Sequence, residues 1–425
     1  LVSATDAIML GAVSQTSLSA VSLAGQIQFV LNLFISGISA GSGIMAAQYW
    51  GKKDAASIEE VMPIALRTNL IFSGAFTVFA AVAPEVLMRI FTSDPALIES
   101  GAVYLRAVSL SYLLCGISQI YLILLKNTGY ATVSSRISCT AVVVNIICNA
   151  ILIYGLFGLP ALGIQGAAYA TVAARLVELV WSYLETKQSG RVQIIWKKMF
   201  HAADAVLTKD FWRYTMPVLG AALVWGIAYV SYSVIMGHMG SDAVAANSIT
   251  TIAKNMLSCL IRGVSGGAGV LIGNLLGAGE LDKAKVYGGR LTRMAIVVGM
   301  TTGGLLMLIS PLIVRFAPLS DTAAEYLQYM LIFCGCNIMA QSVNTTVLDG
   351  IFCAGGDSKF DMKGNLGAMW CFSVPFGFFA AFVLKWPVMV VYCIVNLDEI
   401  VKIPAVYLHY KKYIWVRNIT VQEDA

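Results

Sequence analysis

Long apolar runs recur along the whole chain, and short stretches of turn residues and charges separate them. Each run can cross a hydrocarbon core of about 30 Å as an α-helix, because a helix rises about 1.5 Å per residue. The pattern predicts twelve spans: 1–13, 18–48, 60–84, 96–127, 130–155, 163–187, 209–237, 242–275, 283–314, 322–354, 360–384 and 387–411. We therefore predict an all-α polytopic membrane protein with twelve transmembrane helices. The first is expected to be truncated, because Leu1 lies inside an apolar stretch.

The composition supports this class of protein. Of the 425 residues, 58% are hydrophobic and 12% are charged, and the mean hydropathy is +0.77. A water-soluble domain of this length could not carry such a composition without exposing large apolar patches. The sequence shows no P-loop, nucleotide-binding cassette or metalloprotease pattern, so we expect neither an enzyme nor a cofactor. Energy for any transport should then come from an ion gradient.

The Lys and Arg residues predict the orientation. If the amino terminus is cytoplasmic, nineteen of them fall in inside segments, and four fall in outside segments, namely Arg89, Arg106, Arg315 and Lys385. Positive residues concentrate in cytoplasmic loops, so we expect both termini on the cytoplasmic side of the cell membrane. This topology explains the net charge of +5, and no nucleic-acid partner is needed.

The two halves of the chain repeat each other. Small residues recur in one register, each 226 residues later (263 − 37 = 226): Gly37, Ser39, Gly41, Gly43 and Gly51 match Gly263, Ser265, Gly267, Gly269 and Gly277. Each copy has an even number of spans, which predicts two six-helix lobes related by a pseudo-two-fold axis along the membrane normal. We expect lobes at 1–190 and 209–425, the second with a short cytoplasmic tail. The linker 191–208 should contain an amphipathic helix over Val192–Phe200. Gly51 and Gly277 are expected to be helix C-caps.

Two carboxamides, Asn145 and Asn149, share one helix face of an otherwise apolar span, because they are four residues apart. Asp6 and Thr171 lie at the same depth, roughly 9–15 Å from the outer ends of their spans at about 1.5 Å per residue. A carboxylate inside a membrane must be protonated, paired or bound to a cation. With the three neutral side chains, Asp6 could form an all-oxygen site for Na⁺, or it could hold a proton. The alternative is a structural polar cluster that only packs helices.

Two cations, Lys254 and Arg262, lie in the expected span 242–275, and Arg262 is close to the midplane. If Arg262 faces a cavity, it would repel an organic cation, and the cargo could then be anionic or zwitterionic. The alternative is that Arg262 pairs with Asp349 or extends toward the membrane surface.

Two further pairs of charges lie within expected spans. Arg175 and Glu178, like Glu399 and Lys402, are three residues apart and so share a helix face. We expect both to form local ion pairs, which lower the free energy of inserting the charges into the membrane.

Aromatic side chains could line a cargo cavity. Trp225 and Tyr229 follow helical spacing and could stack on a flat cation. We place them with Phe29 and Arg262 in an expected substrate cavity. The alternative for such an aromatic stripe is ordinary helix packing.

Several motifs, taken in order, resemble the multidrug and toxic-compound extrusion (MATE) family over essentially the whole chain. They are Thr5-Asp6-Ala7-Ile8-Met9-Leu10-Gly11, the Ala47-Gln48 pair before Gly51, Asn145 with Asn149, Gly163–Thr171 and Ala354-Gly355-Gly356-Asp357. The resemblance implies two six-helix lobes around a V-shaped cavity, and export of organic cations in exchange for Na⁺ or H⁺. It also implies that Asp6, Asn145, Asn149 and Thr171 occupy the cation-site positions of the first lobe.

The chain departs from that family's pattern at two places. Many similar transporters carry an Asn-Glu pair on helix seven, but this chain has Gly220–Leu223 between Pro217 and Trp225. The Arg often found before the Ala-Gly-Gly-Asp motif is Cys353. The second lobe therefore lacks the usual acid, and we expect coupling through the first lobe.

These observations lead to one expected function with two alternatives. We expect a secondary active antiporter that exports small amphipathic solutes, organic cations among them, in exchange for Na⁺ or H⁺ by alternating access. Its partners would be the small-molecule substrate and membrane lipid, and it would act as a monomer. The first alternative is a flippase for a lipid-linked precursor, which predicts a basic cavity around Arg262. The second is a degenerate membrane protein that does not transport.

Overall fold

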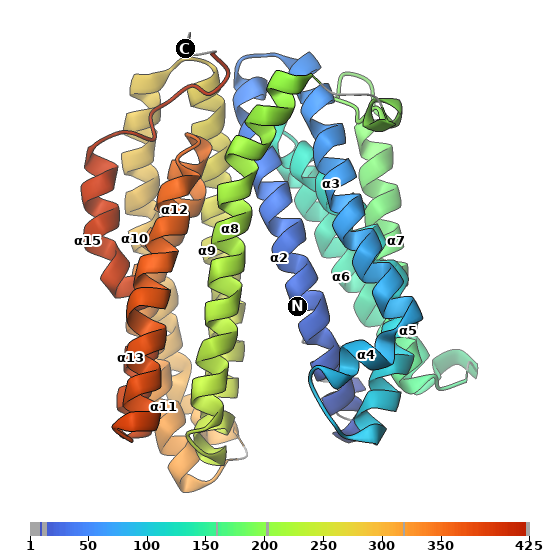
Figure 1. The fold of residues 1–425 in the computed structure, drawn as a ribbon, viewed down its shortest axis with the longest axis vertical. Helices are drawn as coiled ribbons and strands as arrows, with labels where there is room; N and C mark the ends of the chain where they lie inside the picture. The colour runs from blue at the N-terminus through green and yellow to red at the C-terminus, as the bar shows by residue number, and fades with distance from the viewer. Residues whose placement is uncertain (1–8, 11–14, 159, 201–203, 318, 422–425) are drawn as a thin grey trace. The chain divides into compact units, whose positions relative to one another are not determined.

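The computed structural model describes residues 9–10, 15–158, 160–200, 204–317 and 319–421, and all regular structure in these residues is helical (Figure 1). In chain order the helices are α2 (Gln15–Gly51), α3 (Ala55–Val82), α4 (Pro84–Arg89), α5 (Pro95–Asn127), α6 (Ala131–Tyr154), η1 (Leu156–Gly158), α7 (Gly163–Thr186), η2 (Trp196–Phe200), α8 (Ala205–Gly237), α9 (Ser241–Gly277), α10 (Leu281–Phe316), α11 (Asp321–Thr345), η3 (Thr346–Phe352), α12 (Ser358–Asn365), η4 (Leu366–Ser373), α13 (Val374–Phe378), η5 (Phe379–Val383), α14 (Val388–Val395) and α15 (Asp398–Lys411).

Nine helices of the described residues are long and apolar enough to cross a membrane. Three of the twelve expected spans are not among them. Residues 1–13 fall largely outside the described part of the chain. The span 163–187 forms the continuous helix α7, whose charged residues lower its hydropathy. The third expectation, a continuous helix over 387–411, is wrong, because α14 ends at Val395 and α15 begins at Asp398.

Local sequence explains where several helices begin and end. Asp54 caps α3, since its Oδ1 accepts a hydrogen bond from the Ser57 N–H at 3.1 Å. Asp94 caps α5 in the same way, accepting from the Ala96 N–H at 2.9 Å. These side chains satisfy N–H groups that have no partner in the first turn of a helix. At its other end, α6 stops at Gly155, whose φ of 69° is a left-handed conformation that favours glycine.

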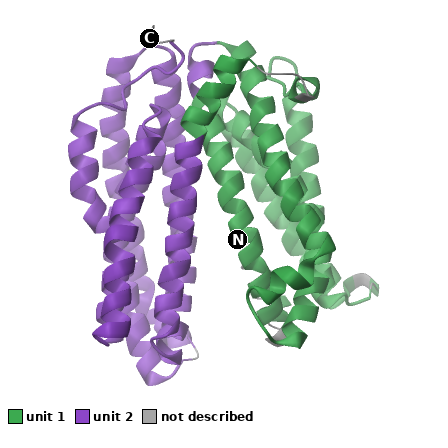
Figure 2. Ribbon diagram, viewed as in Figure 1, with its two compact units in different colours: residues 1–46, 54–215 green, residues 47–53, 216–425 purple. Residues whose placement is uncertain are grey.

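Contacts divide the chain into two compact units, which Figure 2 draws in green and purple. Unit 1 comprises Leu1–Ala46 and Asp54–Thr215, and unit 2 comprises Ala47–Lys53 and Met216–Ala425. In unit 1, α5 packs against α3, α6 and α7. In unit 2, α9, α10 and α11 pack against one another, and α11 also contacts α14 and α15. Each unit has its own buried apolar core.

The segment before α8 belongs to unit 1. Helical structure in the expected amphipathic stretch is limited to η2, a 3₁₀-helix over Trp196–Phe200. The Trp196 indole N–H donates to the Tyr121 hydroxyl at 2.7 Å, which attaches this stretch to α5.

The carboxyl-terminal ends of α2 and α9 approach closely within unit 2. A Cβ on Gly51 would lie 2.1 Å from the Asn274 carbonyl oxygen, and a Cβ on Gly277 would lie 1.8 Å from the Gln48 carbonyl oxygen. The two contacts are related by the repeat, because 48 + 226 = 274 and 51 + 226 = 277. The expectation that these glycines are C-caps is wrong: they are glycine because the two backbones nearly touch. The left-handed residues come two positions later, at Lys53 and Gly279.

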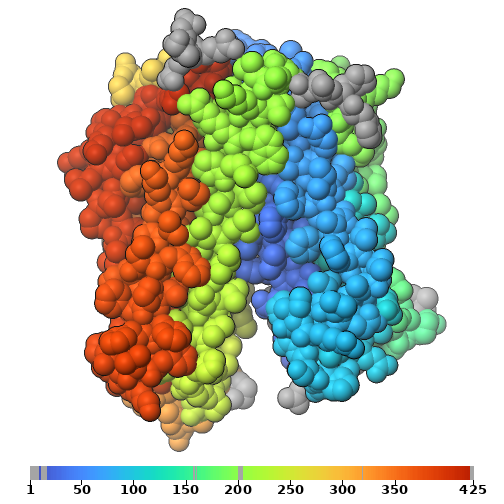
Figure 3. All heavy atoms as spheres, viewed as in Figure 1, coloured from blue at the N-terminus to red at the C-terminus, as the bar shows by residue number. Residues whose placement is uncertain are grey.

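Many large apolar side chains point outward from the long helices. On α10, for example, Leu308 and Phe316 are both 77% exposed. In unit 2 the segment from α12 to η5, orange in Figure 3, lies on the surface beside α8. Its side chains Phe376, Phe378 and Phe379 are exposed. Such a surface suits contact with lipid tails and would be unfavourable in water.

Candidate functional site

The structure brings together three of the four residues expected at a cation site in unit 1. Asn145 and Asn149 on α6 are both 0% exposed, and the Asn149 Nδ2 donates to the Asn145 Oδ1 at 3.2 Å. Asn145 in turn donates from Nδ2 to the Thr171 Oγ1 on α7, at 3.4 Å. The fourth residue, Asp6, lies outside the described residues.

Close packing of α6 and α7 makes this cluster. At Gly166 a Cβ would lie 2.5 Å from the Leu152 carbonyl oxygen, so only glycine permits this approach. One helix turn further along α7, Thr171 donates its hydroxyl hydrogen to the Ala167 carbonyl at 3.1 Å. The Thr171 oxygen therefore faces α6 as an acceptor, and together with the carboxamides it offers neutral oxygen ligands of the kind that Na⁺ prefers.

Unit 2 contains a pocket between α8, α9, α11, α14 and α15. Three of the four residues expected in a substrate cavity line it: Trp225, Tyr229 and Arg262. The rings of Trp225 and Tyr229 stack with centroids 5.4 Å apart, and the Arg262 guanidinium lies 5.6 Å from the centroid of the Trp225 ring. The fourth, Phe29, is half-buried on α2 in unit 1 and does not line this pocket.

Charged groups of both signs line the same pocket. Lys254 and Arg262 project from α9, and Asp398 and Glu399 from the first turn of α15. In the part of the chain that the structure describes, neither α9 cation has a carboxylate oxygen within 4.0 Å. Arg262 thus has no Asp349 oxygen within 4.0 Å, although the two charges interact over a longer distance; pairing with Asp349 was one alternative for its role.

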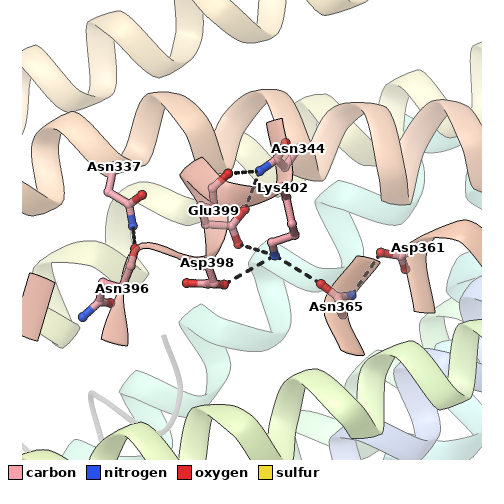
Figure 4. A network of polar contacts seen from close by, with 8 residues as sticks. All are labelled: Asn337, Asn344, Asp361, Asn365, Asn396, Asp398, Glu399 and Lys402. Carbon is pink, nitrogen blue, oxygen red and sulfur yellow. Dashed lines mark hydrogen bonds and ion pairs between the residues drawn. The ribbon is translucent and has the colours of Figure 1, made fainter. Parts of the chain in front are cut away.

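The carboxylates of the pocket are already paired with Lys402. This lysine is only 4% exposed, and its Nζ lies 3.4 Å from Asp398 Oδ2 and 3.1 Å from Glu399 Oε1. It also donates to the Asn365 Oδ1 at 3.2 Å (Figure 4). The expected Glu399–Lys402 pair is therefore confirmed as part of a larger network, and the Arg175–Glu178 pair is confirmed at 2.8 Å.

The network continues into two neighbouring helices. The Asn365 Nδ2 donates to the Asp361 Oδ1 at 3.0 Å within α12, and the Asn344 Nδ2 on α11 donates to the Glu399 Oε2 at 2.8 Å. Figure 4 shows these side chains converging on Lys402 from three segments. Four members of this group were not expected from the sequence: Asn344, Asp361, Asn365 and Asp398. The sequence does contain one indication of this group: Asp361 and Asn365 are four residues apart, like Asn145 and Asn149 in unit 1.

The break between α14 and α15 places this group beside the pocket. Asn396 ends α14, and its carbonyl accepts a hydrogen bond from the Asn337 Nδ2 at 2.9 Å. This bond satisfies a carbonyl that the helix leaves free. Interrupted helices whose ends line a cavity are typical of binding sites in transporters. The nearby π-helical segments η3 and η4 are a second irregularity often found at functional sites.

Comparisons with known proteins agree with this picture. The family model MatE matches residues 1–151 and 217–379. The uncharacterized transporter YisQ of Bacillus subtilis is 23% identical over 97% of this chain and 90% of its own length. A probable multidrug resistance protein NorM of Agrobacterium fabrum is 24% identical over 82% of this chain and 73% of its own length.

Solved structures share the fold at low identity. A MATE crystal structure in the bent conformation superposes with a TM-score of 0.86 at 18% identity, covering 97% of this chain and 91% of that one. A MOP superfamily transporter from Pyrococcus furiosus gives a TM-score of 0.88 at 18% identity, with the same coverage. That protein is described as having a binding pocket of reverse polarity, which suggests a different function for it.

Proposed function

Since the chain belongs to the MatE family of membrane transporters, we propose that it is a secondary active antiporter that exports a small amphipathic solute in exchange for Na⁺ or H⁺. Relatives described as multidrug resistance proteins support export as the direction of transport. The observation that carries the proposal is the buried Asn145–Asn149–Thr171 cluster, because polar groups this deep in a membrane protein usually serve an ion or a partner.

In this proposal the coupling cation binds in unit 1. Asp6 supplies the negative charge, and Asn145, Asn149 and Thr171 supply neutral oxygens. The hydrogen bonds among the last three keep their oxygens within one small volume, which is what a dehydrated Na⁺ requires. If H⁺ is the coupling ion, one of these oxygens would accept the single hydrogen bond that a protonated Asp6 can donate.

Transport would follow alternating access in a twelve-helix monomer of two six-helix lobes, with both termini in the cytoplasm. Binding of the cation and binding of the cargo would each weaken the other, since the two ligands favour opposite states of the transporter. Release of cargo outside would thus follow binding of the cation from the outside.

Gradient-dependent transport in proteoliposomes tests this proposal. We expect uptake of a fluorescent amphipathic dye into inverted vesicles to respond to a Na⁺ or pH gradient. Asp6→Asn should abolish that response, and Asn149→Ala should reduce it about tenfold, equivalent to about 1.4 kcal/mol of cation binding.

Asn69→Ala is the matched control. Asn69 is another buried asparagine of unit 1, and its Nδ2 donates to the Gly116 carbonyl at 3.2 Å, away from the cluster. It should keep the ion dependence of the wild type. Dye transport that ignores every gradient would contradict antiport, and an unchanged ion response in Asp6→Asn would contradict the site.

A second candidate function, a flippase for a lipid-linked precursor, is favoured by the two α9 cations, because such precursors carry phosphates. Movement of a fluorescent polyprenyl pyrophosphate between leaflets of proteoliposomes, without transport of soluble dyes, would identify it.

A further inference from the structure

The unit 2 pocket presents positive charge to a ligand. Its two carboxylates, Asp398 and Glu399, both lie within 3.4 Å of the Lys402 ammonium, which offsets one of their two negative charges. The two cations on the facing helix α9, Lys254 and Arg262, have no carboxylate within 4.0 Å among the described residues. Together with Lys402, the pocket therefore has three positive charges against two negative ones, and the two cations without a close carboxylate lie on α9.

The aromatic surface of the pocket adjoins one of these cations. Trp225 and Tyr229 form a flat stacked pair, and Arg262 lies against the Trp225 ring. An organic cation would have to displace Arg262 from this ring or approach a like charge in a region of low dielectric constant, where repulsion is strong. An anion could contact the guanidinium while its apolar body lies along the rings.

The spacing on α9 sets the size of the ligand. Lys254 and Arg262 are eight residues apart, which corresponds to roughly 12 Å along the helix. An acid group held at one cation would leave the body of the ligand extending past Tyr229 toward the other cation, which could bind a second acidic or polar group.

We propose that the unit 2 pocket binds an organic anion, with an aromatic or other apolar body on Trp225 and Tyr229, a carboxylate, sulfonate or phosphate at one of the cations Lys254 and Arg262, and a second acidic or polar group at the other. This inference rests on the proposed transport function and gives its substrate class. It replaces the organic cations that the family resemblance implies.

Binding of two dyes with the same ring system tests the charge preference. Fluorescein is an anion and a cationic rhodamine carries the opposite charge, but both share a xanthene ring. With the purified full chain in detergent, fluorescence polarisation should give at least about tenfold tighter binding of fluorescein, the effect of about 1.4 kcal/mol. Tighter binding of the rhodamine would overturn the proposal.

Variants connect this preference to the two cations. Lys254→Gln and Arg262→Gln should each weaken fluorescein binding about tenfold, whereas Arg262→Lys, which keeps the charge, should retain most of it. Arg293→Gln is the control, since Arg293 is an exposed cation of unit 2 that does not line the pocket. Unchanged fluorescein affinity in both Gln variants, with an unaltered size-exclusion profile, would overturn the assignment.

Competition distinguishes a soluble acid from a lipid phosphate. Displacement of fluorescein by naphthoate or by farnesyl pyrophosphate would support the proposal and identify the source of the acid. Displacement by tetraphenylphosphonium alone would contradict it. These binding measurements need no ion gradient. If the protein is not an antiporter, or if the unit 1 cation site is wrong, the transport assays would show it and the preference for fluorescein would be unchanged.

Discussion

At the scale of single residues, Lys402 joins the polar network to the edge of the unit 2 pocket. It is buried among Asp398, Glu399 and Asn365, and it offsets one of the two negative charges at the pocket edge. Buried ion pairs contribute little net stability when complete, but removal of one partner leaves an uncompensated charge. Lys402 therefore holds the network together, and without it the two α9 cations and the two carboxylates of the pocket would balance.

Lys402→Met tests this role. The substitution should lower the free energy of unfolding by about 3–5 kcal/mol, because Asp398 and Glu399 lose their counter-charge. Thermal unfolding in detergent measures the effect. Lys363→Met, at an exposed lysine on α12, should change the melting temperature little. Equal stability of the two variants would mean that the carboxylates are neutral without Lys402.

At the scale of elements, the interruption between α14 and α15 is held by a side chain from another helix. The hydrogen bond from Asn337 on α11 satisfies the Asn396 carbonyl, so this carbonyl is not left unpaired inside the membrane. The close contact between the ends of α2 and α9 is the second such device, and it depends on glycine at both repeat-related positions.

Asn337→Leu should increase local unfolding at the interruption between α14 and α15. Loss of the donor leaves the Asn396 carbonyl unsatisfied, at about 1–3 kcal/mol. We expect faster amide hydrogen exchange across residues 392–400, measured by mass spectrometry in detergent. Gln328 lies on the same helix as Asn337, and Gln328→Leu, which removes a hydrogen bond to Ser310 on α10, should leave exchange in that segment unchanged. Equal exchange rates in the two variants would contradict a role for Asn337.

Gly277→Ala should separate the ends of α2 and α9. The added methyl group would overlap the Gln48 carbonyl oxygen, and we expect a destabilisation of about 1–3 kcal/mol. Gly263→Ala on the same helix α9 is the matched control, because a Cβ there meets nothing within 4 Å. Comparable melting temperatures for both variants would show that the helix ends can move apart without loss.

At the scale of the whole molecule, the distribution of Lys and Arg predicts that both termini face the cytoplasm. Green fluorescent protein and alkaline phosphatase fused after Ala425 test this in a bacterial host. The fluorescent fusion should be bright and the phosphatase fusion inactive, because only the former works in the cytoplasm. The opposite pattern would invert the proposed direction of transport.

The sequence by itself determined what depends on the local period of a helix. Apolar runs of sufficient length predicted the membrane spans, and spacings of three or four residues predicted the Asn145–Asn149 contact and the two local ion pairs, since residues so spaced share one helix face. The repeat of 226 residues likewise paired Gly51 with Gly277, although it did not predict that each would pack against the other's helix.

Only the tertiary structure decided which faces meet. Asn344, Asn365 and Lys402 lie on different helices, and no periodicity within one helix shows that they converge. It also decided that the helix over 387–411 breaks, because the donor that permits the break comes from Asn337 on another element. The charge of the pocket follows from the same cause, because packing between helices brings Lys402 to the two carboxylates and leaves the α9 cations without a carboxylate within 4.0 Å among the described residues.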